Sequence, residues 1–191
     1  MVRTNQVFLD YFQDWIKSSA ISSEQAKIKR YSKGEKLLIQ QSRAHQVMII
    51  LEGCTKCFFC EDNDKEFIVE FLGQGEIIGE IEFLRSNPCL CHVEALTPVS
   101  VFSMSYSFFS TILQQDLKFN HLLLSVFADR IIQTSRRASF QQVYSLEHSL
   151  VRLLQFQETQ GLSLSKEDMA SYLGITVRSL NRVLRKIERG V

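Results

Sequence analysis

The sequence predicts an α+β protein in which an antiparallel β sandwich or barrel is followed by a long helix and a helix-turn-helix. Short apolar runs broken by turn residues fill residues 28–104, which is the rhythm of antiparallel strands. Residues 117–144 contain neither glycine nor proline and have helical periodicity. Two short amphipathic segments with a glycine between them follow near the C-terminus.

The composition is typical of a compact, soluble protein. The chain has 191 residues, of which 45% are hydrophobic and 23% charged, with only 2 prolines and 8 glycines. Its N-terminal segment carries Asp10 and Asp14 and lacks the apolar core of a signal peptide. We therefore expect a cytoplasmic protein.

The first element is an amphipathic helix over residues 7–17, with apolar side chains at three- and four-residue spacing. Strands then follow in runs such as QVMIILEG, EFIVEFLG and VSVFSMS. The breaks at Ser32-Lys33-Gly34-Glu35 and Gly73-Gln74-Gly75 contain residues that adopt turn geometry at little steric cost.

The glycine-free segment predicts a helix of about 27 residues, which would span roughly 40 Å. Its apolar stripe is expected to consist of Leu122, Val126, Ile131 and Ile132, with Asp129, Arg130, Arg136 and Arg137 interspersed. A helix longer than a small domain favours pairing with a second copy of the chain. The alternative is an ordinary core helix in a monomer.

Residues 165–188 predict the helix-turn-helix. Ser165 and Asp168 approximate a capping box, Gly174 ends the first helix, and Thr176 caps the second. In the second helix, apolar residues recur at helical spacing: Val177, Leu180, Val183, Leu184 and Ile187.

The residues that this apolar stripe leaves exposed are rich in hydrogen-bond donors: Thr176, Arg178, Ser179, Asn181, Arg182, Arg185 and Lys186. The net charge of the whole chain is only +1, but residues 174–191 hold five cationic side chains against Glu188. Arginines suit guanine edges, Asn181 suits adenine, and Ser179 or Lys186 suits phosphate. The pattern favours DNA binding; the alternative is a helical hairpin with a solvated basic face.

Several motifs together resemble the Crp/Fnr family of bacterial transcription regulators. They are Lys33-Gly34-Glu35, Leu51-Glu52-Gly53, the segment from Leu72 to Glu80 with Phe83, and Ser165 to Leu184. The resemblance implies an antiparallel β-roll (double-stranded β-helix, jelly-roll-like) that resembles a cyclic nucleotide-binding domain and binds an effector, over residues 1–115. It also implies a dimerisation helix over 116–143 and a DNA-binding domain over 144–191.

The same resemblance implies a homodimer that binds a two-fold symmetric double-stranded DNA operator with half-sites roughly 34 Å apart. A contact with RNA polymerase is a further expectation. The chain ends at Gly190-Val191, so the β-hairpin wing that normally follows in this family is absent from this sequence or truncated.

The expected effector-binding residues are Gly79, Glu80, Ile81, Cys89 and Leu90. Glu80 matches the family residue that meets a ribose hydroxyl, whereas Cys89 stands where cyclic-nucleotide-binding members have a phosphate-binding arginine. A buried phosphate without a cation loses charge-assisted bonding, so we expect an unknown small-molecule effector or a redox signal and not cyclic AMP. Arg85 and His92 are the nearby cations.

The five cysteines are Cys54, Cys57, Cys60, Cys89 and Cys91. On a strand, Cys54 and Cys60 would share one face and Cys57 the other, so three ligands would not converge; Cys89 and Cys91 would share a face. Buried thiols are the first interpretation. A thiol redox switch is the second, and an iron–sulfur cluster or another metal held by these thiols is the third. The family's N-terminal cysteine cluster is missing from residues 1–53.

No serine–histidine–aspartate set, P-loop, HExxH or dinucleotide-binding fingerprint occurs, so the sequence does not predict an enzyme. The remaining alternative is an effector-binding or protein-interaction module that no longer binds DNA. A basic second helix favours the regulator, because a protein-binding helix does not require three arginines and a lysine on one side.

Overall fold

The computed structural model describes residues 2–18, 22, 24–63 and 65–188. The first half of the chain consists mainly of strands, with two helices among them: β1 (Val2–Arg3), α1 (Gln6–Ser18), β2 (Ala26–Tyr31), β3 (Lys36–Leu38), β4 (Gln46–Glu52), β5 (Thr55–Cys60), β6 (Glu66–Leu72), β7 (Ile77–Ile78), α2 (Glu80–Arg85), β8 (His92–Ala95) and β9 (Val99–Ser105). Helices fill the second half: α3 (Tyr106–Gln115), α4 (Leu117–Val143), α5 (Leu146–Gln160), α6 (Lys166–Leu173) and α7 (Val177–Glu188).

The strands form a roll of two sheets, ordered β1-β6-β5-β8-β3 and β2-β9-β4-β7. The predicted α+β class with antiparallel strands is confirmed, apart from β1, which the sequence analysis did not anticipate and which pairs parallel to β6. Strand β4 is buried on both faces. Met48 and Ile50 point into the roll, and Val47 and Ile49 pack under the helices. Its continuous apolar run follows from this double burial.

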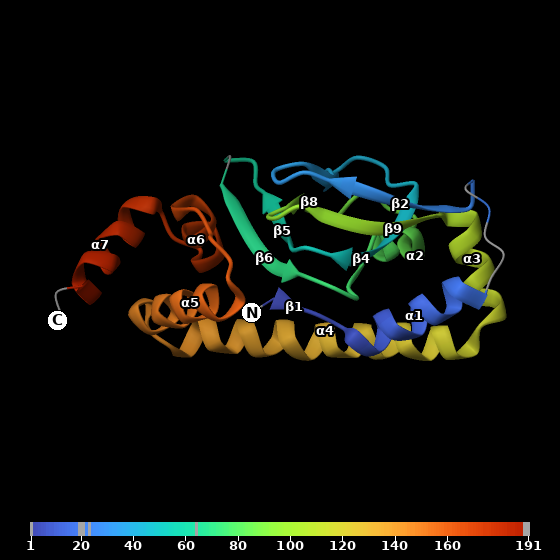
Figure 1. Ribbon diagram of the computed structural model, residues 1–191. Helices are drawn as coiled ribbons and strands as arrows, with labels where there is room; N and C mark the ends of the chain where they lie inside the picture. Colours follow the sequence, from blue (N-terminus) through green and yellow to red (C-terminus); the bar gives the residue numbers. More distant parts are fainter. Residues whose placement is uncertain (1, 19–21, 23, 64, 189–191) are drawn as a thin grey trace.

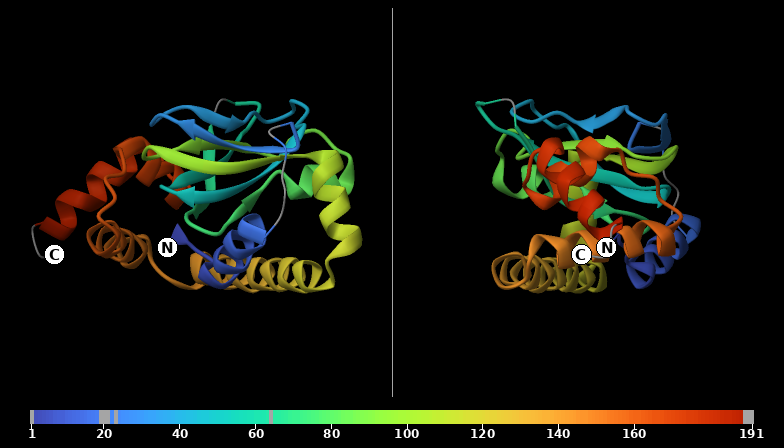
Figure 2. Two further views of the ribbon diagram at one scale, coloured as in Figure 1. Left: turned by 45° about the vertical axis from the view of Figure 1, so that its right-hand side comes forward. Right: turned by 90° about the vertical axis from the view of Figure 1, so that its left-hand side faces the viewer.

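Helix α4 runs along most of the length of the molecule beneath the roll, and α1 lies beside it on the same side of the roll (Figures 1 and 2). Asp116 caps α4 by accepting from the Phe119 backbone N–H at 2.9 Å. Phe119, Leu123 and Val126 form its buried face against α1. Phe8 and Phe119 are in ring contact, with centroids 5.5 Å apart.

The expectation of one apolar stripe on this helix is wrong in part. Val126 is buried and Leu122 half-buried against the core, but Ile131 and Ile132 are exposed on the other side. The inward positions that follow Val126 are taken by arginines. The sequence pattern combined residues of two faces because leucine, valine and isoleucine occur on both.

The outward face of α4 carries large apolar side chains at seven-residue intervals. Leu117, Leu124 and Ile131 are 84%, 66% and 67% exposed. A seven-residue repeat of apolar residues is the spacing by which two helices pair along their length. The described helices include none that is long and apolar enough to cross a membrane.

The C-terminal helices pack against the outer face of β5 and β6, at one end of the roll (Figure 1). Phe71 of β6 stacks on Tyr172 of α6 and Phe156 of α5, with ring centroids 5.1 and 5.7 Å apart. Leu150, Leu180 and other apolar residues complete this cluster. The helix-turn-helix is therefore attached to the roll through an apolar core and not only through the chain.

Candidate nucleic-acid interface and effector site

The turn between α6 and α7 has the local geometry that its residues predict. Ser165 Oγ accepts from the backbone N–H of Asp168 at 3.0 Å and so caps α6. Gly174 ends the helix in the left-handed region, at φ 68°, and the Ile175 N–H then donates to the Ala170 carbonyl at 3.0 Å. Thr176 Oγ1 accepts from the Ser179 N–H at 3.1 Å, which starts α7.

Helix α7 buries one side and exposes a basic side. Leu180 and Val183 are buried in the cluster shared with the roll. Among the predicted DNA-binding residues, four cationic side chains and the capping threonine are exposed and two polar side chains are half-buried: Arg178, Arg182, Arg185, Lys186 and Thr176, then Ser179 and Asn181. In Figure 1, α7 lies at the far end of the molecule from α3, beyond the roll.

Three of these predicted residues have side-chain partners within the protein. Lys186 Nζ lies 3.1 Å from Glu147 on α5, and both side chains are about half exposed. Ser179 Oγ is 3.2 Å from Thr176 Oγ1. An exposed ion pair is worth little, so Lys186 can exchange Glu147 for another anion at small cost.

Helix α6 is held to the roll by polar contacts that the sequence did not reveal. Lys56 Nζ on β5 binds Asp168 at 2.6 Å and Glu94 at 3.3 Å. Arg137 of α4 donates to the backbone carbonyls of Ile68 (2.7 Å) and Tyr172 (2.9 Å). Arg137 thus connects α4, β6 and α6 through one guanidinium group.

The predicted effector site is built around the turn into α2. Gly79 has φ 88°, and a Cβ there would lie 2.5 Å from the Gln46 carbonyl oxygen, so only glycine fits. Glu80 follows as the first residue of α2 and is 2% exposed. The structure therefore buries the carboxylate that the sequence analysis assigned to an effector.

Glu80 is paired with an arginine of α4. Arg130 hydrogen-bonds to the Glu80 carboxylate, to Glu76 Oε2 at 3.1 Å and to the Ile77 carbonyl at 2.6 Å. Arg3 Nε binds the same Glu76 oxygen at 2.8 Å. Two buried carboxylates and two guanidinium groups form this cluster, which we call the Arg130 network.

Burial and ion pairing shift the pKa values of Glu80 and Arg130 in opposite directions. Burial raises the pKa of Glu80, and the neighbouring Arg130 charge lowers it by less. Burial lowers the pKa of Arg130, but Glu80 and Glu76 outweigh burial and raise it. Arg130 therefore stays charged. Sequence reasoning missed Arg130 and Arg137, although both continue the inward positions of α4 at seven-residue spacing from Leu123.

The other predicted effector residues are scattered around α2. Cys89 is buried in the roll interior, 3.8 Å from Ser42 Oγ, whereas the Ile81 and Leu90 side chains are exposed. Of the nearby cations, Arg85 is exposed, and His92 accepts a hydrogen bond from the Gln40 N–H at 3.2 Å.

The cysteines divide between separate environments. Cys54 packs in the cluster under the C-terminal helices, whereas Cys57, Cys89 and Cys91 contact the roll interior, so Cys54 and Cys57 face different clusters. A hydrogen bond to the Cys91 thiol, together with burial, raises the pKa of Cys57. No group of three or more His, Cys, Asp or Glu side chains in the described part of the chain converges as metal ligands.

Comparison with known proteins gives a consistent result over most of the chain. Residues 28–116 match the cyclic nucleotide-binding domain family. The chain is 22% identical over 174 residues to the "cAMP-activated global transcriptional regulator Vfr" of Pseudomonas aeruginosa, covering 84% of this chain and 81% of Vfr.

Solved structures share the fold. A Crp/Fnr-family transcriptional regulator from Eubacterium rectale has a TM-score of 0.81 at 16% identity, covering 95% of this chain and 88% of that one. The c-di-GMP-responsive regulator CLP of Xanthomonas campestris has a TM-score of 0.75 at 20% identity, covering 87% and 88%. The α+β roll with flanking helices and a C-terminal helix-turn-helix is thus shared with these regulators.

Proposed function

Since this chain is a homologue of the Crp/Fnr regulators and contains their cyclic nucleotide-binding domain, we propose that it is a sequence-specific DNA-binding transcription regulator. In this proposal, residues 1–115 sense an effector or a redox signal, 116–143 dimerise and 144–191 read DNA. The expectation of an absent or truncated wing concerns the end of the sequence, where residues 189–191 lie outside the described residues.

The observation that carries the proposal is the exposed basic side of α7. Three arginines on this helix, Arg178, Arg182 and Arg185, are exposed and have no acidic partner within the described residues. A recognition helix enters the major groove and contacts base edges with its N-terminal half. Arg178, Asn181 and Arg182 occupy this half and supply donors for guanine and adenine edges.

A homodimer would cover the outward face of α4. Leu117, Leu124 and Ile131 would then pack against the same residues of a second copy, which removes a row of apolar side chains from water. Two α7 helices related by two-fold symmetry would read two half-sites of a palindromic operator. A contact with RNA polymerase remains a prediction.

We further propose that the signal is not cyclic AMP. The position expected to bind the cyclic phosphate is Cys89, a buried thiol, and the cation nearest to Glu80 is Arg130, which already binds two carboxylates. A nucleotide would have to displace Arg130 from Glu80 and still lack a dedicated phosphate ligand. Displacing Arg130 would also move α4, which is how we expect a signal to reach the helix-turn-helix.

Selection from a random double-stranded DNA pool with the full chain, followed by fluorescence anisotropy on the enriched sequence, tests the proposed function. Arg182→Gln should weaken the Kd for this sequence by about 5- to 150-fold, the equivalent of 1–3 kcal/mol for a lost base contact. Arg30→Gln, an exposed arginine on β2, is the matched control and should leave the Kd unchanged.

If selection enriches no sequence, or if Arg182→Gln and Arg30→Gln bind the enriched DNA equally well, the result would instead support the protein-interaction module. The oligomeric state is measured separately by sedimentation. Leu124→Glu together with Ile131→Glu should convert a dimer to a monomer, because charges would replace the apolar repeat. A monomer already in the unmodified chain would contradict the dimer.

A further inference from the structure

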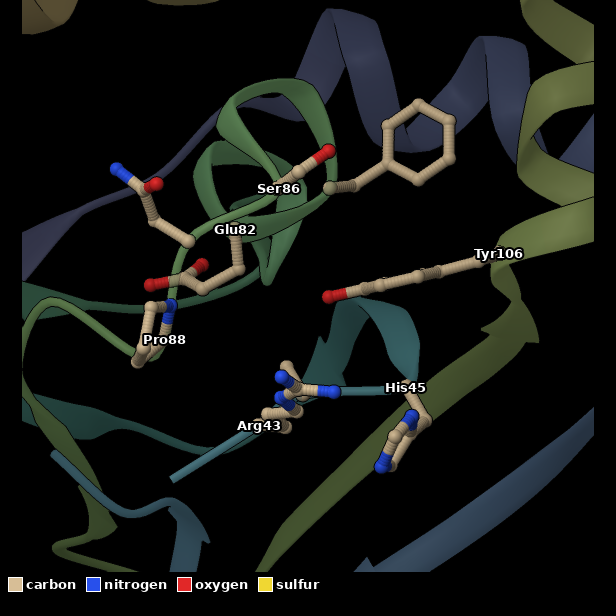
Figure 3. A pocket seen from close by; sticks show the side chains of 9 residues that line it. Arg43, His45, Glu82, Ser86, Pro88 and Tyr106 are labelled. Atoms are coloured by element: carbon tan, nitrogen blue, oxygen red, sulfur yellow. The ribbon is translucent and has the colours of Figure 1, made fainter. Parts of the chain in front are cut away.

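A second candidate small-molecule site lies on the other side of α2 from the Arg130 network. A cavity of about 450 Å³ is formed by α2, the loop after it, the segment before β4 and the start of α3 (Figure 3). Glu80 and Glu82 are two positions apart on α2, so they point to different sides of the helix. Glu80 binds Arg130, and Glu82 lines the cavity.

Glu82 is a buried carboxylate without an ion-pair partner among the described residues. It is 6% exposed, and its Oε1 accepts from the Leu90 backbone N–H at 3.0 Å. The ion pairs of the described residues leave Glu82 out, since Arg130 binds Glu76 and Glu80 instead. A buried charge without a counter-charge is costly, so the protein keeps Glu82 at the expense of stability.

The Tyr106 hydroxyl is a second buried polar group that faces this space. It has no hydrogen-bond partner among the described residues, and Figure 3 shows it extending toward Glu82. Its ring is fixed by an edge-on contact with Phe83, with centroids 5.2 Å apart. Burial, with Glu82 adding to it, raises the pKa of Tyr106 to about 12, so the group remains an uncharged hydroxyl whose oxygen can accept a hydrogen bond.

The opposite side of the cavity is basic. Arg43 and His45 lie there in Figure 3, and both are exposed and without an acidic partner among the described residues. A carboxylate and a hydroxyl therefore line one part of the cavity, and a guanidinium and an imidazole line another. Phe83 and Pro88 add apolar surface to the lining.

We propose that this cavity binds a small zwitterion with a protonated amine and a carboxylate, the chemistry of a free amino acid. The amine would bind Glu82 and the Tyr106 oxygen, and the carboxylate would bind Arg43 and His45. A simple anion would be repelled by Glu82, and a simple amine would leave Arg43 unpaired. A ligand with both charges satisfies both ends of the cavity, whose volume lies in the range of small-molecule sites.

This inference goes beyond the proposed DNA-binding function and depends on none of it. Because α2 carries both Glu82 and Glu80, a ligand bound to Glu82 in the cavity would contact the same helix that binds Arg130 of α4 through Glu80. The cavity would then be a second input to the same long helix.

Isothermal titration of the full chain without DNA tests the site, using the standard L-amino acids and γ-aminobutyrate as probes at millimolar concentration. At least one probe should bind saturably. Its N-acetyl derivative and its amide, which each lack one charge, should bind at least about tenfold more weakly. Failure of every probe to bind overturns the proposal, as does equal binding of the N-acetyl derivative, which would indicate a plain anion site.

Variants tie the binding to the cavity. Glu82→Gln keeps an acceptor for the Leu90 N–H but removes the charge, and it should weaken the Kd by about 10- to 100-fold. Arg43→Gln should act in the same direction, and Tyr106→Phe should cause a smaller loss. Arg85→Gln, exposed on α2 outside the cavity, is the control. Circular dichroism verifies the fold of each variant, and a Kd that Glu82→Gln does not change overturns the assignment.

Discussion

Replacing Arg130 by methionine tests whether the Arg130 network holds α4 to the roll. Methionine fills much of the same space but leaves Glu80 without its partner. Removing one partner of a buried ion pair costs about 3–5 kcal/mol, because the remaining charge stays buried. Glu76 retains Arg3 at 2.8 Å, so we expect a loss in the free energy of unfolding near the lower end, about 3 kcal/mol.

The loss should depend on pH, because Glu80 can take up a proton. Its pKa is already raised by burial, and removing Arg130 raises it further. A carboxyl group with a higher pKa in the folded than in the unfolded state binds more protons when folded, so folding is favoured as the pH falls. The Arg130→Met variant should therefore recover part of its stability in mildly acidic buffer.

Urea denaturation followed by circular dichroism, at neutral and mildly acidic pH, measures both effects. Glu80→Gln is the matched control, because the amide oxygen still accepts from Arg130 and no unpaired charge is left at position 80. The double variant closes a thermodynamic cycle that isolates the pairwise energy. A loss of unfolding free energy below about 1 kcal/mol at neutral pH would mean that Arg130 and Glu80 contribute no more than an exposed ion pair, which contradicts this expectation. A loss of equal size at both pH values would contradict the predicted proton uptake by Glu80.

Three other perturbations have definite expected outcomes. Gly79→Ala should lower the melting temperature far more than Gly34→Ala, since both glycines have φ near +88° but an added Cβ meets the Gln46 carbonyl only at Gly79; equal shifts in thermal denaturation would contradict the predicted clash. Cys54 should react with a thiol reagent only after unfolding, because burial raises its pKa to about 12. Mass spectrometry measures the labelling rate, and labelling of Cys54 in the folded protein as fast as that of an exposed thiol would rule this out. Arg137→Met should increase proteolysis of the α5–α7 region, because methionine has no N–H donor for the two carbonyls that Arg137 bridges; an unchanged cleavage pattern would show that the apolar cluster alone holds these helices.

The α6–α7 segment could be predicted almost to the residue. Its signals are local: Ser165 and Thr176 cap helices within three positions, and Gly174 supplies the left-handed turn. The exposed basic side of α7 follows from the same periodicity, because burying Leu180 and Val183 fixes which residues remain outside.

The effector region was less predictable. Glu80 was identified by its place in a motif, but its partner Arg130 is 50 positions away. The sequence does not show which of the four charged residues at 129, 130, 136 and 137 face the protein interior. In the structure, Arg130 and Arg137 point inward. Cys57 and Cys91 similarly became neighbours only when β5 paired with β8.

Features that depend on neighbours a few positions apart could be predicted from the sequence: the strand rhythm, the helix caps, the long uninterrupted helix and the basic side of α7. Which face of α4 meets the roll, that Arg130 lies beside Glu80, and that Glu82 lines a cavity without an ion-pair partner among the described residues all depend on the tertiary structure. The two groups of features differ in how far apart in the sequence the interacting residues lie. Periodicity and capping act within one or two turns, whereas the pairing of buried charges depends on which elements the apolar core brings together.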